Sequence, residues 1–172
     1  MNNLTPRKIE VDTSQIPKYW AGGLVYPTHF LNAISLSFPA VEKMVVIIMK
    51  AILKDIEDPK LIADIKDFCQ QENNHSAIHH KFNAWLLAGN HPPKALDEFV
   101  SWCKDVNTRS MKERVSAMIA FEYFTGSCSR LLMRTFAQAR EDGRIDEESF
   151  KLWYWHCAEE IEHHEMGWEL VD

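Results

Sequence analysis

Two distant stretches of the chain repeat one spacing, Cys-x-x-Glu-x-x-His. The residues concerned are Cys69, Glu72 and His75 in the first copy and Cys157, Glu160 and His163 in the second. Positions three apart lie on one face of an α-helix, so in each copy a carboxylate and an imidazole converge on one point. No segment alternates for long with the period of two that strands require. The repeat therefore predicts an all-helical fold in which two such helices meet.

Five helix-compatible segments follow an irregular start. We expect an N-terminal arm over residues 1–30, which carries several Pro and Gly residues, and a single domain over residues 31–172. Proline fits a first helical turn or a kink, so Pro39 leaves the start of the first helix open. The expected helices are Leu31 or Pro39 to Asp55, Pro59–Leu87, a short one at Lys94–Lys104, Ser110–Arg140, and Asp146 to the end.

The lengths of the connections predict how these helices are joined. Short turns link the first long helix to the second and the third to the fourth, whereas residues 90–108 make a longer link between the two hairpins. Two helical hairpins joined by a crossover are typical of ferritin-like four-helix bundles, not of simple up-down-up-down bundles. The predicted fold is therefore a ferritin-like four-helix bundle with an irregular arm.

Each long helix carries one glutamate on an otherwise apolar stripe. These residues are Glu42, Glu72, Glu122 and Glu160. A buried, unpaired carboxylate costs several kcal/mol, so something must compensate each of them.

The four glutamates fall at matching heights in the two predicted hairpins. Glu42 lies 15 residues before Glu57, near the first turn, and Glu72 lies 15 after it. Glu122 lies 20 residues before Asp142, near the second turn, and Glu160 lies 18 after it. At about 1.5 Å of rise per residue, this mismatch of two residues is only about 3 Å. One layer can therefore hold all four.

Four carboxylates and two imidazoles in one layer predict a two-metal centre. The expected ligands are Glu42, Glu72, His75, Glu122, Glu160 and His163, a set typical of di-iron and di-manganese carboxylate proteins. Four carboxylates neutralise two divalent cations, and oxygen-rich ligation suits iron or manganese, with zinc also open. We assign bridging, catalytic roles to Glu72 and Glu160, terminal carboxylates to Glu42 and Glu122, and terminal nitrogens to the two histidines.

Simpler explanations exist for the same residues taken singly. Glu42 close behind Pro39 could complement a helix dipole, and Glu72 with His75 could be a surface pair. Glu160 stands among other glutamates (Glu159, Glu162 and Glu165) that suggest a solvated acidic face. His79 could be an outer donor, an extra ligand or a core histidine. We interpret Cys69 and Cys157 as packing residues.

Composition excludes several classes of partner. The net charge of −6 argues against nucleic acid, which requires a basic face. The longest apolar run, residues 44–53, is about half of a membrane span, and the polar start has no signal-peptide character. We expect a cytoplasmic protein.

The order of motifs resembles the predicted metal-dependent hydrolase family of the ferritin-like superfamily. The stretches that carry the resemblance are Arg7-Lys8-Ile9, Pro17-Lys18-Tyr19-Trp20, Phe38-Pro39-Ala40-Val41-Glu42, Gln71-Glu72-Asn73-Asn74-His75 with His79, Glu122-Tyr123-Phe124-Thr125, and Trp155-His156-Cys157-Ala158-Glu159-Glu160-Ile161-Glu162-His163. The resemblance implies the same six metal positions. It also implies a longer C-terminal region than a chain ending at Asp172.

Two enzyme chemistries and two alternatives to an enzyme stay open at this level. A two-metal site can activate water for hydrolysis, or with iron it can use oxygen to oxidise an organic substrate, which we favour because carboxylates tolerate higher-valent iron. Iron storage without an organic substrate, or a purely structural bundle, are the alternatives. For an enzyme we expect a monomer or homodimer, an electron donor of unknown identity, and a small substrate. Trp153, Trp155, Phe121 and Tyr123 indicate either an apolar pocket for it or plain core.

Overall fold

The computed structural model describes residues 4–88 and 90–169, without the side chains of residues 164–169. Over these residues the chain is all-helical, as predicted, and its only strand-like pairing is a single bridge between Ala21 and Ile145. No helix in this part of the chain has the length and apolar character to cross a membrane. The α-helices are α1 (Val25–Ile52), α2 (Pro59–Leu87), α3 (Lys94–Val106), α4 (Met111–Glu141) and α5 (Glu147–Glu169), with 3-10 turns at Thr13–Gln15 and Leu53–Asp55.

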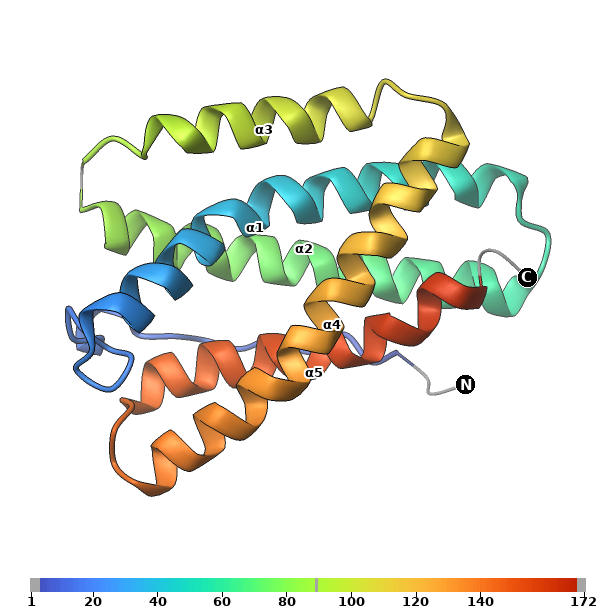
Figure 1. The fold of residues 1–172 in the computed structure, drawn as a ribbon. Helices are drawn as coiled ribbons and strands as arrows, with labels where there is room; N and C mark the ends of the chain where they lie inside the picture. Colours follow the sequence, from blue (N-terminus) through green and yellow to red (C-terminus); the bar gives the residue numbers. More distant parts are fainter. Residues whose placement is uncertain (1–3, 89, 170–172) are drawn as a thin grey trace.

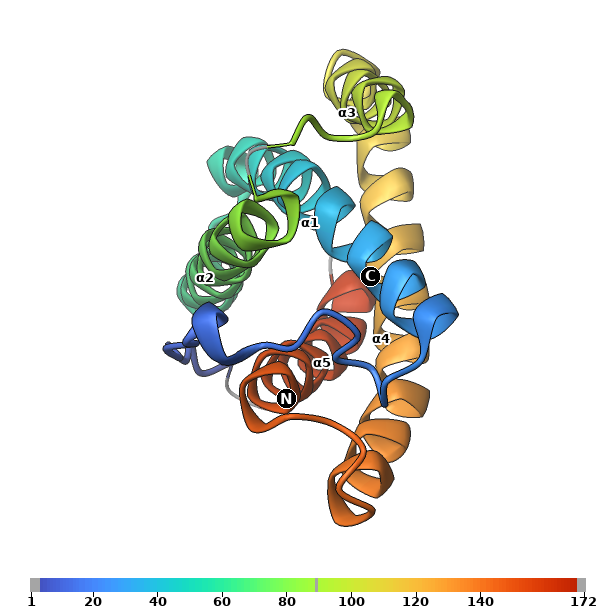
Figure 2. The ribbon, with the colours of Figure 1, turned by 90° about the vertical axis from the view of Figure 1, so that its left-hand side faces the viewer.

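The long helices form two antiparallel pairs. α1 packs along α2, and α4 packs along α5 (Figure 1). α3, with the links on either side of it, carries the chain from the end of α2 to the start of α4, and it packs mainly on α1. Seen end-on, the first pair faces the second, and α3 lies outside them (Figure 2). The connection is therefore a long crossover that returns the chain to the far end of the molecule.

Helix α2 begins and ends where local chemistry requires. The Asp58 carboxylate accepts a hydrogen bond from Lys60 N at 2.9 Å, and Pro59 occupies the first turn, where its missing N–H costs nothing. The helix closes on Ala88, which adopts a left-handed conformation with φ of 44°. Both ends agree with the bounds expected from sequence.

Helix α1 is longer than expected. It begins at Val25, six residues before the earliest start that we predicted, and Pro39 lies in its interior. Proline cannot donate to the carbonyl four residues earlier, which belongs to Ser35. That carbonyl accepts a hydrogen bond from Asn83 Nδ2 of α2 at 2.9 Å instead. A contact between helices therefore makes the interior proline tolerable.

Two apolar clusters form the core, one toward each end of the bundle. One gathers the C-terminal half of α1 with α2, α3 and α4, and the other gathers the arm, α5 and the opposite helix ends. The arm belongs to the second cluster, because Trp20 is 1% exposed and stacks on Trp153 at 5.6 Å between ring centroids. Trp20 Nε1 also donates to Asn32 Oδ1 of α1 at 2.9 Å.

Candidate metal centre

A layer of buried polar side chains lies between the two apolar clusters. Glu42 comes from α1, Glu122 from α4, and the two Glu-x-x-His motifs come from α2 and α5. All six predicted ligands are at most 6% exposed. The structure thus brings together residues that are spread over 121 positions of the chain, from Glu42 to His163.

Short distances join these side chains around two centres. His163 Nδ1 lies 2.9 Å from Glu72 Oε1 and 3.3 Å from Glu122 Oε2. On the other side, His75 Nδ1 lies 3.5 Å from Glu160 Oε1. Glu72 belongs to both groups of mutually close ligand atoms, one with Glu122 and His163 and the other with His75 and Glu160. This arrangement suits Glu72 as a bridge.

A third histidine faces the same layer, and the sequence analysis did not select it. His156 is 2% exposed, and its Nε2 lies 3.1 Å from Glu160 Oε1. Its ligand atom also groups with those of Glu42 and His75. His156 precedes Glu160 by four residues, so the helical spacing His-x-x-x-Glu-x-x-His on α5 was the available signal.

Each histidine is oriented by a partner on its outer nitrogen. His75 Nε2 lies 3.0 Å from Glu159 Oε2, and His163 Nε2 lies 3.2 Å from Gln71 Oε1. The simpler explanation of a solvated acidic face does not hold for Glu159, since the residue is fully buried and its Oε1 accepts hydrogen bonds from Arg7. Such outer partners set ring orientation and tautomer at metal sites.

His79 lies one step outside the layer. Its Nε2 is 2.8 Å from His156 Nδ1, and its Nδ1 is 2.8 Å from Ser35 Oγ. Of the alternatives that the sequence left open, this placement matches an outer partner. Full burial is the main cause that holds the pKa of His79 well below its usual value, and repulsion from the neighbouring His156 and His75 lowers this pKa further.

The two cysteines of the repeat, Cys69 and Cys157, are buried packing residues. Burial raises the pKa of Cys69 to about 11 and that of Cys157 to about 12, so both remain thiols at neutral pH.

Trp153 and Trp155 are buried at 1% and 8% exposure, whereas Tyr123 is 53% exposed. The two tryptophans are therefore core residues.

Two of the four carboxyl groups, those of Glu42 and Glu122, resist ionisation. Burial, and then Glu72, raise the pKa of Glu42 well above its usual value, and burial raises the pKa of Glu122 to about 8. Burial also acts against ionised Glu160, but His156 and His75 outweigh it and hold the pKa of Glu160 well below 4.5. Removing positive charge from this layer would therefore leave like charges crowded together.

The histidines respond in the opposite direction. Burial lowers the pKa of His75, but Glu159 and Glu160 outweigh it and raise that pKa to about 10. Glu72 and Glu122 likewise overcome burial and hold the pKa of His163 well above its usual value. In the metal-free protein, protons on these rings supply part of the positive charge that the carboxylates need.

Hydrogen bonding leaves the inner face of the layer unsatisfied. The buried atoms without a hydrogen-bond partner among the described residues include Glu42 Oε1 and Oε2, Glu72 Oε1, Glu122 Oε2, His75 Nδ1, His156 Nε2 and His163 Nδ1. Each ion pair that these glutamates form within the same residues is made to a histidine. Native proteins rarely leave so many buried polar atoms unpaired. Cations bound among them would satisfy the atoms and the charge together, so the donor set fits metal ions.

A model of the predicted metal-dependent hydrolase family matches residues 5–172. The chain belongs to this family. The match agrees with buried Glu and His clusters that can hold metal ions, and it supports a metal-dependent enzyme. No curated protein and no solved structure gives a significant match.

Members of a metal-dependent family need a route to the metal, and one cavity reaches this layer. It measures about 350 Å3 and lies between α1 and α2, with Glu42 and Glu72 in its lining. Lys43, Lys50 and His80 also line it. Water or a small reactant could approach the carboxylates there.

Proposed function

We propose that this layer binds two metal ions, iron by preference, in a ferritin-like four-helix bundle. Glu72 and Glu160 would be shared by both ions, Glu42 and His75 would complete the ligand set of one ion, and Glu122 and His163 would complete that of the other. One observation carries the proposal: seven buried carboxylate and imidazole atoms from four helices, His156 Nε2 among them, have no hydrogen-bond partner within the described residues. The α1–α2 and α4–α5 pairs joined through α3 are compatible with that bundle.

The chemistry that we favour is oxygen-dependent oxidation of a small organic substrate. Bound iron would pass to dioxygen two electrons from the electron donor expected above, and the organic substrate would supply the other two. The protein side chains hold that centre nearly neutral, since four carboxylates balance two divalent ions. Burial restricts the approach of water to the cavity between α1 and α2, and the outer partners Glu159 and Gln71 keep His75 and His163 pointing inward.

Hydrolysis is the second candidate, because the family description names it. In that case the same residues would hold metal ions that supply Lewis acidity for water activation and for stabilising an oxyanion. The carboxylates Glu72 and Glu160 would again bridge, and no redox change of the metal would be needed. A redox-inert metal such as zinc therefore separates the two chemistries.

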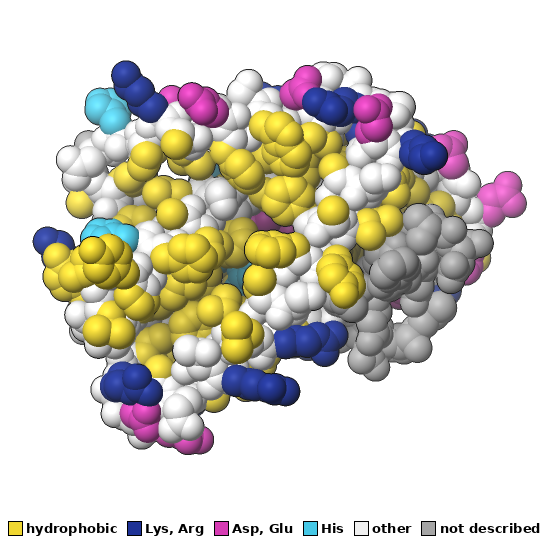
Figure 3. All heavy atoms as spheres, viewed as in Figure 1, with side chains coloured by type: hydrophobic (Ala, Val, Ile, Leu, Met, Phe, Trp, Pro, Cys, Tyr) yellow, Lys and Arg dark blue, Asp and Glu magenta, His cyan; other side chains and the backbone are white. Residues whose placement is uncertain are grey.

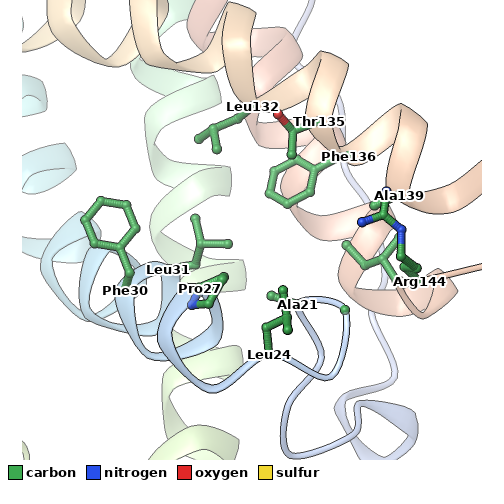
Figure 4. Close-up of a pocket in the computed structure, with 12 residues that line it drawn as sticks. Ala21, Leu24, Pro27, Phe30, Leu31, Leu132, Thr135, Phe136, Ala139 and Arg144 are labelled. Atoms are coloured by element: carbon green, nitrogen blue, oxygen red, sulfur yellow. The ribbon is translucent and has the colours of Figure 1, made fainter. Parts of the chain in front are cut away.

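Apolar surface on the molecule supports the proposal of an apolar substrate. The face seen in Figure 3 is largely hydrophobic, and acidic and histidine side chains are visible at depth between the hydrophobic ones. A cavity of about 250 Å3 lies between the start of α1 and the second half of α4. In Figure 4, Leu31 of α1 faces Leu132 and Phe136 of α4 across it. We propose that such apolar surfaces hold the hydrocarbon part of the substrate.

The first experiment is metal analysis by plasma mass spectrometry after anaerobic loading with Fe2+ or Mn2+. We expect about two ions per chain, and loss of both in a Glu72→Ala/Glu160→Ala double variant. A matched control, Glu57→Ala/Glu141→Ala, removes two exposed glutamates and should keep both ions. A folded wild-type protein that takes up no metal would overturn the proposal.

Activity assays then separate the functions. Oxygen consumption by the iron form that rises with apolar substrates supports oxidation, whereas ester or amide cleavage that persists in the zinc form supports hydrolysis. Light scattering coupled to gel filtration tests iron storage, because a large shell would support storage and a monomer or dimer supports an enzyme.

A further inference from the structure

Pro39 starts a chain of hydrogen bonds that ends at the metal layer. Because it has no N–H, the Ser35 carbonyl lacks its helical donor and accepts from Asn83 Nδ2 at 2.9 Å. This bond orients the Asn83 amide, so its oxygen Oδ1 is the atom that faces Ser35 Oγ, at 2.7 Å. An amide oxygen only accepts, so the Ser35 hydroxyl donates its single proton to Asn83.

The position of that proton decides the tautomer of His79. Ser35 Oγ has no second proton, so its 2.8 Å contact with His79 Nδ1 requires the ring N–H to donate. His79 is neutral, because it is fully buried and its two hydrogen-bond partners, a hydroxyl and a ring nitrogen, carry no negative charge. A neutral imidazole has one N–H, which leaves His79 Nε2 as an acceptor.

The same reasoning passes to His156. Its Nδ1 lies 2.8 Å from the acceptor His79 Nε2, so His156 Nδ1 carries the proton. Its other nitrogen, Nε2, then presents a lone pair toward Glu160 Oε1, 3.1 Å away. Two acceptor atoms at this distance are favourable only with a cation between them: a proton on the ring in the metal-free protein, and a metal ion in its place when the site is loaded. The relay from α1 through α2 to α5 thus prepares one specific ring nitrogen for a metal ion.

We propose that His156 is a seventh metal ligand, binding through Nε2, and that Asn83, Ser35 and His79 are positioning residues that fix its tautomer. The inference rests on the proposed two-metal function and deepens it. The two positions become unequal, since His75 and His156 serve the ion beside Glu42, whereas His163 alone serves the ion beside Glu122. His75 and His163 face the layer with Nδ1, so His156 differs from them in the nitrogen that it uses.

Nitrogen NMR tests this assignment without any substitution. The probe is Zn2+, which is diamagnetic, added to protein labelled with 15N-histidine, and long-range proton–nitrogen correlations report which ring nitrogen carries a proton. We expect His156 to show a metal-bound Nε2 and a protonated Nδ1, with His75 and His163 showing the reverse. A protonated Nε2 on His156 in the zinc-loaded protein would overturn the proposal.

Zinc titrations against a chromophoric chelator test the relay. Ser35→Ala removes the acceptor for His79, and outer-partner losses of this kind lower metal affinity about 10–100-fold. We expect that loss at one of the two positions, and at least as large a loss at the same position in His156→Ala. The control is Ser149→Ala, which removes a fully buried α5 hydroxyl that has no hydrogen-bond partner in the described part of the chain and should leave both affinities unchanged.

The outcomes separate the two proposals. If wild type binds two ions and His156→Ala binds them with unchanged affinities, the seventh ligand is refuted and the two-metal function stands. Equal affinities in Ser35→Ala and Ser149→Ala would refute the relay. A folded wild type that binds neither Zn2+ nor Fe2+ would refute both proposals. Circular dichroism establishes that each variant is folded.

Discussion

Glu122 offers a direct test of the idea that the metal layer costs stability when metal is absent. The residue is 6% exposed on α4, and among the described residues its Oε2 has no hydrogen-bond partner, although His163 Nδ1 lies 3.3 Å away. Burial raises its pKa from 4.5 to about 8. Glu122→Gln keeps the shape of the side chain and removes the ionisable group. We expect this substitution to stabilise the metal-free protein.

The pKa shift sets the size of the effect. At pH 7 the unfolded chain ionises this carboxyl, whereas the folded protein keeps it protonated. Holding that proton roughly 2.5 pH units above the usual pKa of 4.5 costs about 3 kcal/mol, at about 1.36 kcal/mol per unit. Losing the interaction with His163 returns about 1 kcal/mol. The net gain is therefore about 2 kcal/mol, or a rise of about 4–8 °C in Tm for a chain of this length.

The sign of the pH dependence follows from the raised pKa. Below pH 4.5 the carboxyl is protonated in both states, so the advantage of Glu122→Gln is absent there. It grows as pH rises and levels off above about pH 8, where the folded carboxyl also ionises. Metal should shrink or reverse the advantage, because ions at 1,000 times Kd stabilise wild type by about 4 kcal/mol and the variant has lost a ligand.

The assay is urea unfolding followed by circular dichroism at pH 5, 6, 7 and 8, with chelator and then with saturating Zn2+. Glu141→Gln, at the exposed end of the same helix, is the matched control and should change stability by less than about 0.5 kcal/mol. A Glu122→Gln variant that is less stable than wild type in chelator, or a difference independent of pH, would refute the reasoning.

Three further outcomes follow from the structure. Metal binding should release protons, because metal ligands must be deprotonated and the metal-free protein holds protons on His75 (pKa about 10) and Glu122 (pKa about 8). Metal affinity should therefore rise from pH 6 to pH 9. Calorimetry in buffers of different ionisation enthalpy measures the number of protons released, and a value of zero would contradict this prediction. Ala88→Gly should raise the free energy of unfolding by about 1 kcal/mol, since Ala88 has a φ of 44°, and a loss in urea unfolding would contradict this. Phe68→Ala should lower it by about 3–5 kcal/mol, because the ring is fully buried against His163, and a loss below 1 kcal/mol would argue against that packing.

The helix bounds show where local signals were sufficient. α2 begins at Pro59 behind its Asp58 cap and ends at a chain breaker, so propensity and capping predicted both ends. The predicted start of α1 was wrong, because a proline such as Pro39 is locally typical of a helix boundary. Its tolerance depends on Asn83, which comes from another helix and lies 48 residues from Ser35. No local pattern contains that contact.

The sequence by itself determined the helical periodicity, the repeat of Glu-x-x-His and the matching heights of four glutamates, because these depend only on helix rise and on distance from a turn. Tertiary structure alone decided which atoms complete the layer. Whether His156 faces inward, Glu159 is buried and His79 stands behind another histidine depends on how α5 is rotated against α2, and the packing of the whole core sets that rotation. Helical spacing says which residues share a face, but only the assembled bundle says what that face meets.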